Sequence, residues 1–345
     1  FIMLIAFFLI SAYFNSYNLR TTIAQEPVAK SYFNDYLGFL RNFYLVERGV
    51  GYYDGLITVH TEDGRSSTIP QKAWNWRLPS YAYLWKIFPG SGGISVYIFF
   101  LTLSSITLYY TFQIGKIILD SDHANLIPYV LLPYFHFGAR DLSFLEMEWW
   151  GLPFLIISIY AIFKNRLNLL FLSSVMAMIL RELYLIPVFL WSILMVVSRN
   201  YKKARAFTFA MVIFVVVIAL HYFKVTEYIS RYWNSLSFDS KSLNLIPFQQ
   251  TLSYGSVDYL FFRFRPLLLS LVVTVVLLVI NLYQRKINLN LFILPLTGLS
   301  MAIFTLKFAT KDADYWGIIY VPLILISFVI LTIKTVNSDE KKQLA

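Results

Sequence analysis

The sequence predicts an all-α polytopic membrane protein with about ten transmembrane helices. Of its 345 residues, 58% are hydrophobic and only 14% are charged, and the mean hydropathy is +0.61. A soluble domain is about half apolar and about a quarter charged. The chain also contains repeated apolar runs of about 18 or more residues, which is the length that crosses a bilayer as a helix. We therefore expect a single helical transmembrane domain over residues 1–345.

The apolar runs place the helices in order. Residues 1–13 are apolar but short, and the chain starts at Phe1, so we expect the first helix to have lost its beginning. Further helices are predicted at 94–115, 124–137, 142–163, 168–180, 184–198, 206–223, 264–283, 289–306 and 315–334. The runs at 124–137 and 168–180 are short for a full span, and we expect them to tilt or to enter a cavity.

Basic residues predict the orientation of these helices. They gather in one set of connections: Lys164 and Arg166, "RNYKKAR" (199–205), Arg285 and Lys286, and the tail with Lys334, Lys341 and Lys342. All of them fall on one side if the helices alternate, and Lys and Arg mark the cytoplasmic side. The other side then receives the first loop (14–92), the turn at 136–141, Arg181–Glu182, a second large loop (224–263) and residues 307–316.

Composition excludes several functions. The chain has no cysteine, so disulfides and thiolate catalysis are impossible. The net charge of +10 suits cytoplasmic anchoring or the holding of an anionic lipid-linked substrate. The basic residues are scattered rather than gathered in one patch, which argues against nucleic-acid binding. The four histidines are dispersed, and no phosphate-binding loop, dinucleotide fingerprint or HExxH pair occurs.

The first loop contains an amphipathic pattern in "SYFNDYLGFLRNFYLVERGVGYYDG" (31–55). Its apolar residues recur at helical spacing, and they are Leu37, Leu40, Phe43, Tyr44 and Leu45. We expect a helix that lies on the membrane surface. Asn34 or Asp35 would cap its start, and Gly49 and Gly51 would end it.

Charged residues also stand at the other outward helix ends. They are Arg140, Asp141, Glu146 and Glu148 in one segment, Arg181 and Glu182 in "MILRELYLIP", and Asp312 and Asp314 near the last helix. Ionisable groups near membrane depth suggest a site with a partner, although each alone also suits a solvated helix end. Glu146 and Glu148 are two apart, so they point in different directions on a helix. Arg181 should lie at the membrane–water boundary, where its planar donor fork suits phosphate. Glu182 would pair with it or act elsewhere in the cavity.

Four stretches resemble the GT-C superfamily of integral membrane glycosyltransferases. "NDYLGFLRNFYLVERGVGYY" is similar to that family's acidic–Tyr, amphipathic-helix, Gly–Tyr order in the first loop. "WRLPSYAYLW" resembles its Arg–x–Pro–x–Tyr segment, and "LRELYLIP" its outward Arg–Glu element. "DYWGIIYVP" resembles the start of its last helix, except that Asp314 stands where an Arg often precedes the Tyr.

The resemblance implies inverting transfer of a hexose or pentose from a polyprenyl-phosphate-linked donor at the extracytoplasmic (periplasmic, extracellular or lumenal) face. The acceptor would be a glycan, a lipid or a protein. Asp35 would be the general base, and Arg181 and Arg77 would bind the donor phosphate. Trp74, Trp76 and Tyr53 would stack on sugars. Four other acidic residues are alternative candidates for the base, for binding sugar hydroxyls or for binding a Mg²⁺ or Mn²⁺ ion: Glu148, Glu146, Asp54 and Asp314.

Two other classes of protein stay open. A transporter or flippase of a lipid-linked substrate would need ionisable residues at mid-membrane, whereas most charges here stand at helix ends. An outward arginine would also suit an O-antigen polymerase or ligase-like enzyme, and a non-catalytic membrane subunit is a further alternative. Ligase-like enzymes usually carry their largest loop late in the chain, whereas here the long loop is early.

Overall fold

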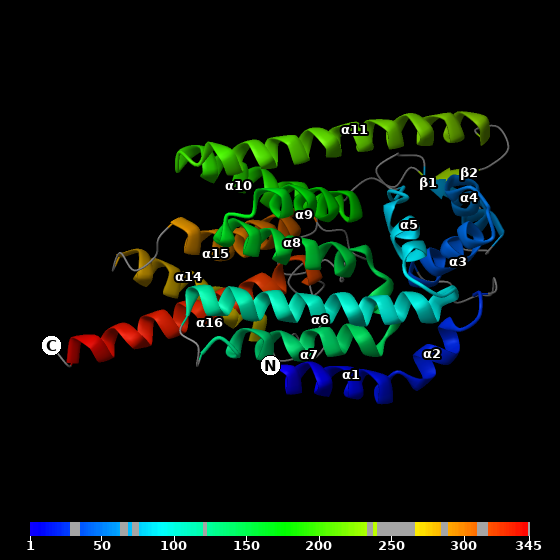
Figure 1. Cartoon of the computed structure of the whole chain (residues 1–345). Helices are drawn as coiled ribbons and strands as arrows, with labels where there is room; N and C mark the ends of the chain where they lie inside the picture. The colour runs from blue at the N-terminus through cyan, green and yellow to red at the C-terminus, as the bar shows by residue number, and fades with distance from the viewer. Residues whose placement is uncertain are drawn as a thin grey trace.

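The computed structural model describes residues 1–27, 35–62, 68–70, 76–119, 123–232, 237–239, 266–283, 289–308 and 317–343. It is a helical bundle (Figure 1) with the following elements: α1 (Ile2–Asn15), α2 (Tyr17–Ile23), α3 (Asp35–Glu47), α4 (Tyr52–Glu62), β1 (Thr68–Pro70), α5 (Ser80–Ile87), α6 (Gly92–Ile118), α7 (Leu126–Arg140), η2 (Leu142–Leu145), α8 (Met147–Lys164), α9 (Leu167–Leu180), η3 (Glu182–Tyr184), α10 (Leu185–Val197), α11 (Tyr201–Tyr232), β2 (Ser237–Asp239), α14 (Pro266–Tyr283), α15 (Leu289–Phe308) and α16 (Gly317–Gln343). Each of the ten apolar runs in the sequence lies mainly within one of the long helices.

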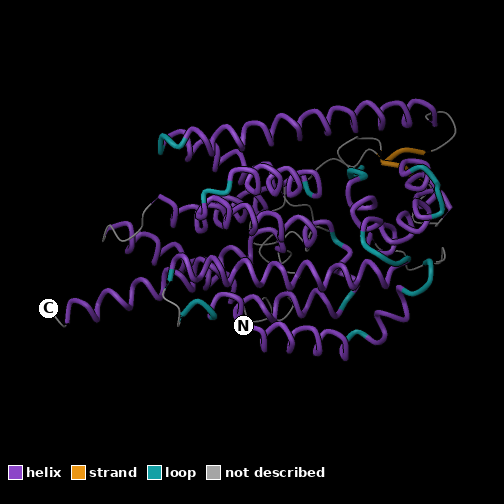
Figure 2. The backbone as a smooth tube through the Cα atoms, viewed as in Figure 1, coloured by secondary structure: helices purple, strands orange, loops and turns teal. Residues whose placement is uncertain are grey.

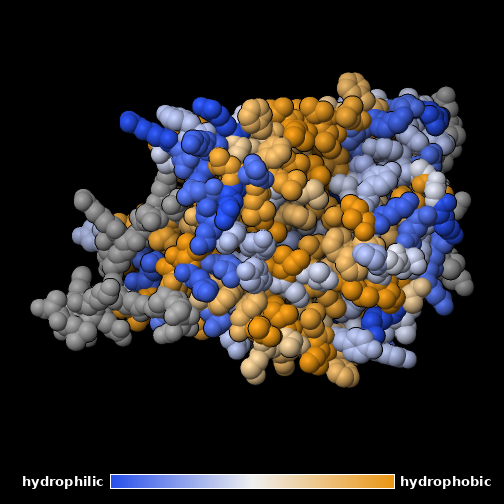
Figure 3. All heavy atoms as spheres, viewed as in Figure 1, coloured by the Kyte–Doolittle hydropathy of each residue, from blue (hydrophilic) through white to orange (hydrophobic). Residues whose placement is uncertain are grey.

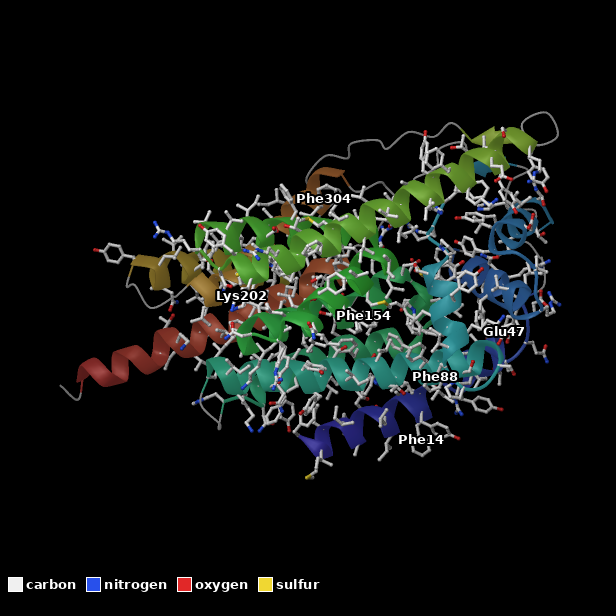
Figure 4. The ribbon with its side chains drawn as sticks, turned by 45° about the horizontal axis from the view of Figure 1, so that its top comes forward. Phe14, Glu47, Phe88, Phe154, Lys202 and Phe304 are labelled. Carbon is white, nitrogen blue, oxygen red and sulfur yellow. The ribbon has the colours of Figure 1, made fainter. Side chains whose placement is uncertain are left out.

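The long helices lie side by side, and α3, α4 and α5 cover one end of the bundle (Figure 1). The three-residue strands β1 and β2 pair in parallel at that same end, where Figure 2 draws them in orange. The junctions between α8 and α9 and between α10 and α11 lie at the opposite end. Figure 4 labels Glu47 and Lys202 at these two ends. We call them the α3–α5 end and the basic end.

Among the described residues, four helices are long and apolar enough to cross a membrane: Gly92–Ile118, Met147–Lys164, Tyr201–Tyr232 and Ile318–Val336. Helices α1 and α2 would form a fifth span as one bent unit, with a 67° angle between them. Several other apolar helices are shorter than a full span, including α9 and the region from Glu182 to Val197. Figure 3 shows a hydrophobic band between two more hydrophilic ends, which agrees with a membrane protein.

A tight turn and a charged hydrogen bond fix the C-terminal end of α3. Gly49 adopts φ +90°, and the N–H groups of Gly49 and Val50 donate to the carbonyls of Val46 and Leu45. These two bonds form a Schellman turn, which needs a left-handed residue just after the helix. The Glu47 carboxylate accepts from the Gly92 N–H at 3.0 and 3.1 Å, at the start of α6, where the helix dipole favours an anion.

The expected position of α3 on the membrane surface is wrong in one respect. Leu40 and Phe43 are fully buried, and the helix packs against α4, α5, η2 and α6. The apolar face that would have entered lipid is therefore covered by protein.

The second large loop begins later than expected. Residues 224–232 belong to α11, which runs unbroken for 32 residues. At 1.5 Å per residue this helix is about 48 Å long, whereas a hydrocarbon core is about 30 Å thick. Its last turns therefore extend beyond the apolar band and reach the α3–α5 end, as Figure 1 shows.

Candidate functional site

A buried ion pair lies where α9 ends near the α3–α5 end. Nε of Arg181 is 2.6 Å from Oε1 of Glu148, and these two side chains are 3% and 0% exposed. Arg181 is the C-cap residue of α9, and Glu148 lies in the first turn of α8. Nη1 of Arg181 also lies 3.4 Å from Oε2 of Glu182, which is 28% exposed. Glu148, from a separate helix, is therefore the closer partner.

Glu148 is unusual because the hydrogen-bonding capacity of its buried carboxylate is only partly used. Among the described residues no group donates a hydrogen bond to either buried carboxylate oxygen, and Oε1 makes the ion pair with Arg181. The Tyr184 hydroxyl donates a hydrogen bond to the backbone carbonyl of Glu148 at 3.0 Å, not to its carboxylate. A buried acceptor without a donor costs roughly 1–3 kcal/mol, and such an atom in a native fold calls for an explanation.

The first loop reaches this ion pair through α5. The hydroxyl of Ser80, the first residue of α5, donates to the carbonyl of Ile179 near the end of α9. Arg77 lies three residues before Ser80, and Arg181 lies two residues after Ile179. The contact therefore brings the two predicted phosphate-binding arginines to the same end of the bundle.

A histidine network lies beside this junction. Nε2 of His221 is 3.0 Å from the Trp76 carbonyl, which can only accept, so Nε2 carries the proton. Nδ1 then accepts from the Tyr53 hydroxyl at 2.8 Å, and the two rings stack with centroids 5.7 Å apart. Glu182 is close enough to His221 to interact with it electrostatically. The network thus links α4, the segment before α5 and α11 to the Arg181 junction.

The end of α11 adds a second contact with α4. The Tyr228 hydroxyl donates to Oδ2 of Asp54 at 2.9 Å, and the Tyr53 and Tyr228 rings lie 5.4 Å apart. Leu56, Ile57 and Val225 complete a small apolar cluster here. This cluster fixes Asp54 and Tyr53 at the junction between the first loop and α11.

Buried phenols surround Arg77. The Tyr52 hydroxyl donates to the Arg77 carbonyl at 2.7 Å, and Tyr52 lies edge-on to Tyr81. Burial raises the pKa of Tyr81 to about 12, although the hydrogen bond with Asn42 and the positive charge of Arg77 lower it. Burial likewise raises the pKa of Tyr53 to about 12. The Arg77 side chain is half-buried beside these rings.

The predicted residues have different outcomes. Arg181, Glu148 and Glu182 come together directly, and Tyr53, Asp54, Trp76 and Arg77 lie in the adjoining networks. Two side chains are less accessible than expected: Arg181 is 3% exposed and so covered by protein, and Trp76 is only 2% exposed, so its ring is covered by the cluster. Glu146 is buried at the N-cap position of α8.

Asp35 is the first residue of α3, but its side chain, Trp74 and Asp314 lie outside the described residues.

His221 was missed because the sequence shows the four histidines far apart. A usable signal was present, since His221, Val225, Tyr228 and Tyr232 follow helical spacing past the predicted end of the apolar run. This stripe predicts that the helix continues and presents polar tips along one face.

Within the described ranges, no three His, Asp or Glu side chains are grouped so that they could hold a metal ion. Comparisons of the chain with protein-family models, with curated proteins and with solved structures found no match.

Proposed function

We propose that this chain is an inverting glycosyltransferase of the GT-C kind, which uses a polyprenyl-phosphate-linked sugar. Its ten long helices would cross or enter the membrane, with the basic end in the cytoplasm and the α3–α5 end on the extracytoplasmic side. The proposal combines the sequence resemblance with one structural observation. That observation is the buried Arg181–Glu148 pair at the end covered by the first loop, in which no described residue donates a hydrogen bond to Oε2 of Glu148.

The position of this pair supports the proposal. It lies at the α3–α5 end, whereas the described Lys and Arg of the two helix junctions lie at the other end (Figure 4). A lipid-linked sugar keeps its phosphate and sugar at the membrane boundary, so its site must stand at a helix end rather than at mid-membrane. The first-loop helices α3, α4 and α5 would shape the entrance.

The proposed reaction exchanges one carbon–oxygen bond for another. The acceptor hydroxyl attacks the anomeric carbon, and the Asp35 carboxylate takes the proton of that hydroxyl. The bond between the anomeric carbon and the phosphate oxygen breaks, and the phosphate leaves with the electron pair. Attack opposite the leaving group inverts the anomeric centre. Asp35 is the first residue of α3, and the resemblance assigns the base to this position of the first loop.

The arginines would stabilise the departing phosphate. A guanidinium presents a rigid donor fork to phosphate oxygens, and fixed cations at a developing charge lower the barrier. Glu148 would hold Nε of Arg181, while the longer contact from Glu182 would give way to the donor. Oε2 of Glu148 would then accept from a sugar or acceptor hydroxyl, which explains why it lacks a donor in the fold itself.

The test is a transfer assay with purified full-length chain and a panel of polyprenyl-phosphate sugars, with and without EDTA. Nucleotide sugars serve as control donors. We expect turnover only with the lipid-linked donors. Arg181→Lys keeps the charge beside Glu148 but loses the planar fork, so we expect it to lower turnover roughly tenfold or more.

The control is Arg231→Lys, which changes an exposed arginine at the same end. Its turnover should match the wild type. A folded wild-type protein that turns over none of the lipid-linked donors would contradict the proposal and favour a transporter or a non-catalytic subunit. Loss of activity with EDTA would show that a divalent ion takes part.

A further inference from the structure

Lys203, at the basic end, is a largely covered lysine that forms no ion pair with another described residue. The residue is only 4% exposed. It begins the buried stripe of α11 that continues through Phe207, Ala210 and Phe214, the face on which α11 packs against α9 and α10. Among the described residues, no carboxylate is close enough to act on its ammonium group. A buried charge is costly unless it is paired, so the site calls for an anion.

The surroundings of Lys203 are electropositive. The basic junction comprises Lys164, Arg166, Arg199, Lys202, Lys203 and Arg205, and neither "FKNRLN" nor "SRNYKKARA" contains an acid. The N-termini of α9 and α11 lie at this same end, and α9 has no side-chain cap. Helix N-termini carry partial positive charge and exposed N–H groups. Two helix N-termini and six basic residues therefore lie at this one end of the bundle.

The neighbouring surface is apolar and faces outward. Val196 and Val197 at the end of α10 are 49% and 71% exposed, and Phe209 and Val212 on α11 are 63% and 54% exposed. These side chains belong to the apolar part of the two helices that carry the basic junction. An anion bound at Lys203 would thus lie next to a surface that takes acyl chains.

We propose that Lys203 and the basic junction bind the phosphate headgroup of an anionic phospholipid, with its acyl chains along α10 and α11. The ammonium of Lys203 pairs with the phosphate, and the more exposed basic residues surround it. Basic clusters next to a membrane helix attract anionic lipids in general. The buried position of Lys203 makes this a defined site rather than a diffuse attraction.

The test is native mass spectrometry of the full chain in detergent, titrated with phosphatidylglycerol or with phosphatidylcholine of the same acyl chains. We expect a single phosphatidylglycerol molecule to be retained in preference to phosphatidylcholine. Lys203→Gln should weaken this binding about tenfold, the scale of one lost charged hydrogen bond. Lys203→Arg keeps the charge and should retain the lipid.

Two controls separate a site from surface charge. Lys224→Gln removes an exposed lysine elsewhere on α11 and should leave binding unchanged. Lys202→Gln removes an exposed lysine beside the site and should cost less than Lys203→Gln. Equal retention of the two lipids, unchanged binding in Lys203→Gln, or displacement of the lipid by equimolar inorganic phosphate would each overturn the proposal. If Lys203→Gln does not fold, the two-lipid comparison on the wild type still decides it.

Discussion

Arg181 and Glu148 meet at 2.6 Å inside the protein although 32 residues separate them in the sequence. Their helices, α8 and α9, pack closely along their length, and the hydroxyls of Ser158 and Ser173 join them at 2.8 Å. The pair therefore couples the start of α8 to the end of α9 at the candidate site.

Breaking this pair from one side should destabilise the protein. Arg181→Met leaves the buried Glu148 carboxylate without this cation and should lower the free energy of unfolding by roughly 3–5 kcal/mol. Glu148→Leu should cost less, because Glu182 still lies beside Arg181. The double variant should recover most of that loss, because both charges are gone. Equilibrium unfolding in mixed micelles measures all three variants. The matched control is Glu227→Ala, whose exposed pairs with Lys224 and Arg231 should contribute less than about 1 kcal/mol. Losses that simply add in the double variant would show that the two groups do not interact.

The Tyr53–His221 bond should hold α4 against α11. Tyr53→Phe leaves Nδ1 of His221 without its donor, which should cost roughly 1–3 kcal/mol. Hydrogen–deuterium exchange should then speed up in α4 and around Trp76, while α9 stays protected. Tyr83→Phe, at a 52% exposed tyrosine of α5, is the control and should leave exchange unchanged. Unaltered protection of α4 in Tyr53→Phe would mean that the apolar cluster alone holds it.

Two buried phenols of the first loop predict an alkaline transition. The pKa of Tyr53 and of Tyr81 is about 12 in the fold, against about 10 in the unfolded chain. A raised pKa means that folding favours the neutral phenol. The raised pKa of each phenol therefore adds to the free energy of unfolding. This stabilisation is complete below pH ~10 and is lost as the pH rises through about 12. Tyrosinate absorbance should therefore show a late step that shrinks in Tyr81→Phe. If the late step is of equal size in Tyr81→Phe, Tyr81 is not one of the late-titrating phenols.

The helical fold could be predicted well because apolar runs and caps are local signals. Gly49 ends α3 as predicted, since its left-handed backbone is a property of that one position. The end of α11 was placed too early because the apolar run stops near residue 223 while the helix continues on polar residues. Packing on α4, through Val225 and Tyr228, stabilises those last turns.

The candidate site was less predictable because its partners come from distant segments. The sequence places Glu182 beside Arg181, so it suggests that pair, whereas the closer carboxylate, Glu148, depends on how α8 packs on α9. The role of His221 becomes visible only through its hydrogen bonds with Tyr53 and the Trp76 carbonyl. No spacing rule in one sequence connects these residues.

The central claim is sugar transfer with Asp35 as the base, and its most direct test is the activity of Asp35→Asn. The variant removes the proposed proton acceptor and keeps a side chain of the same size that can still cap a helix. We expect transfer from polyprenyl-phosphate sugars to fall roughly 10²–10⁴-fold, while the melting temperature stays that of the wild type and Glu227→Gln, an exposed carboxylate of α11, keeps full activity. Wild-type turnover by Asp35→Asn would contradict the account.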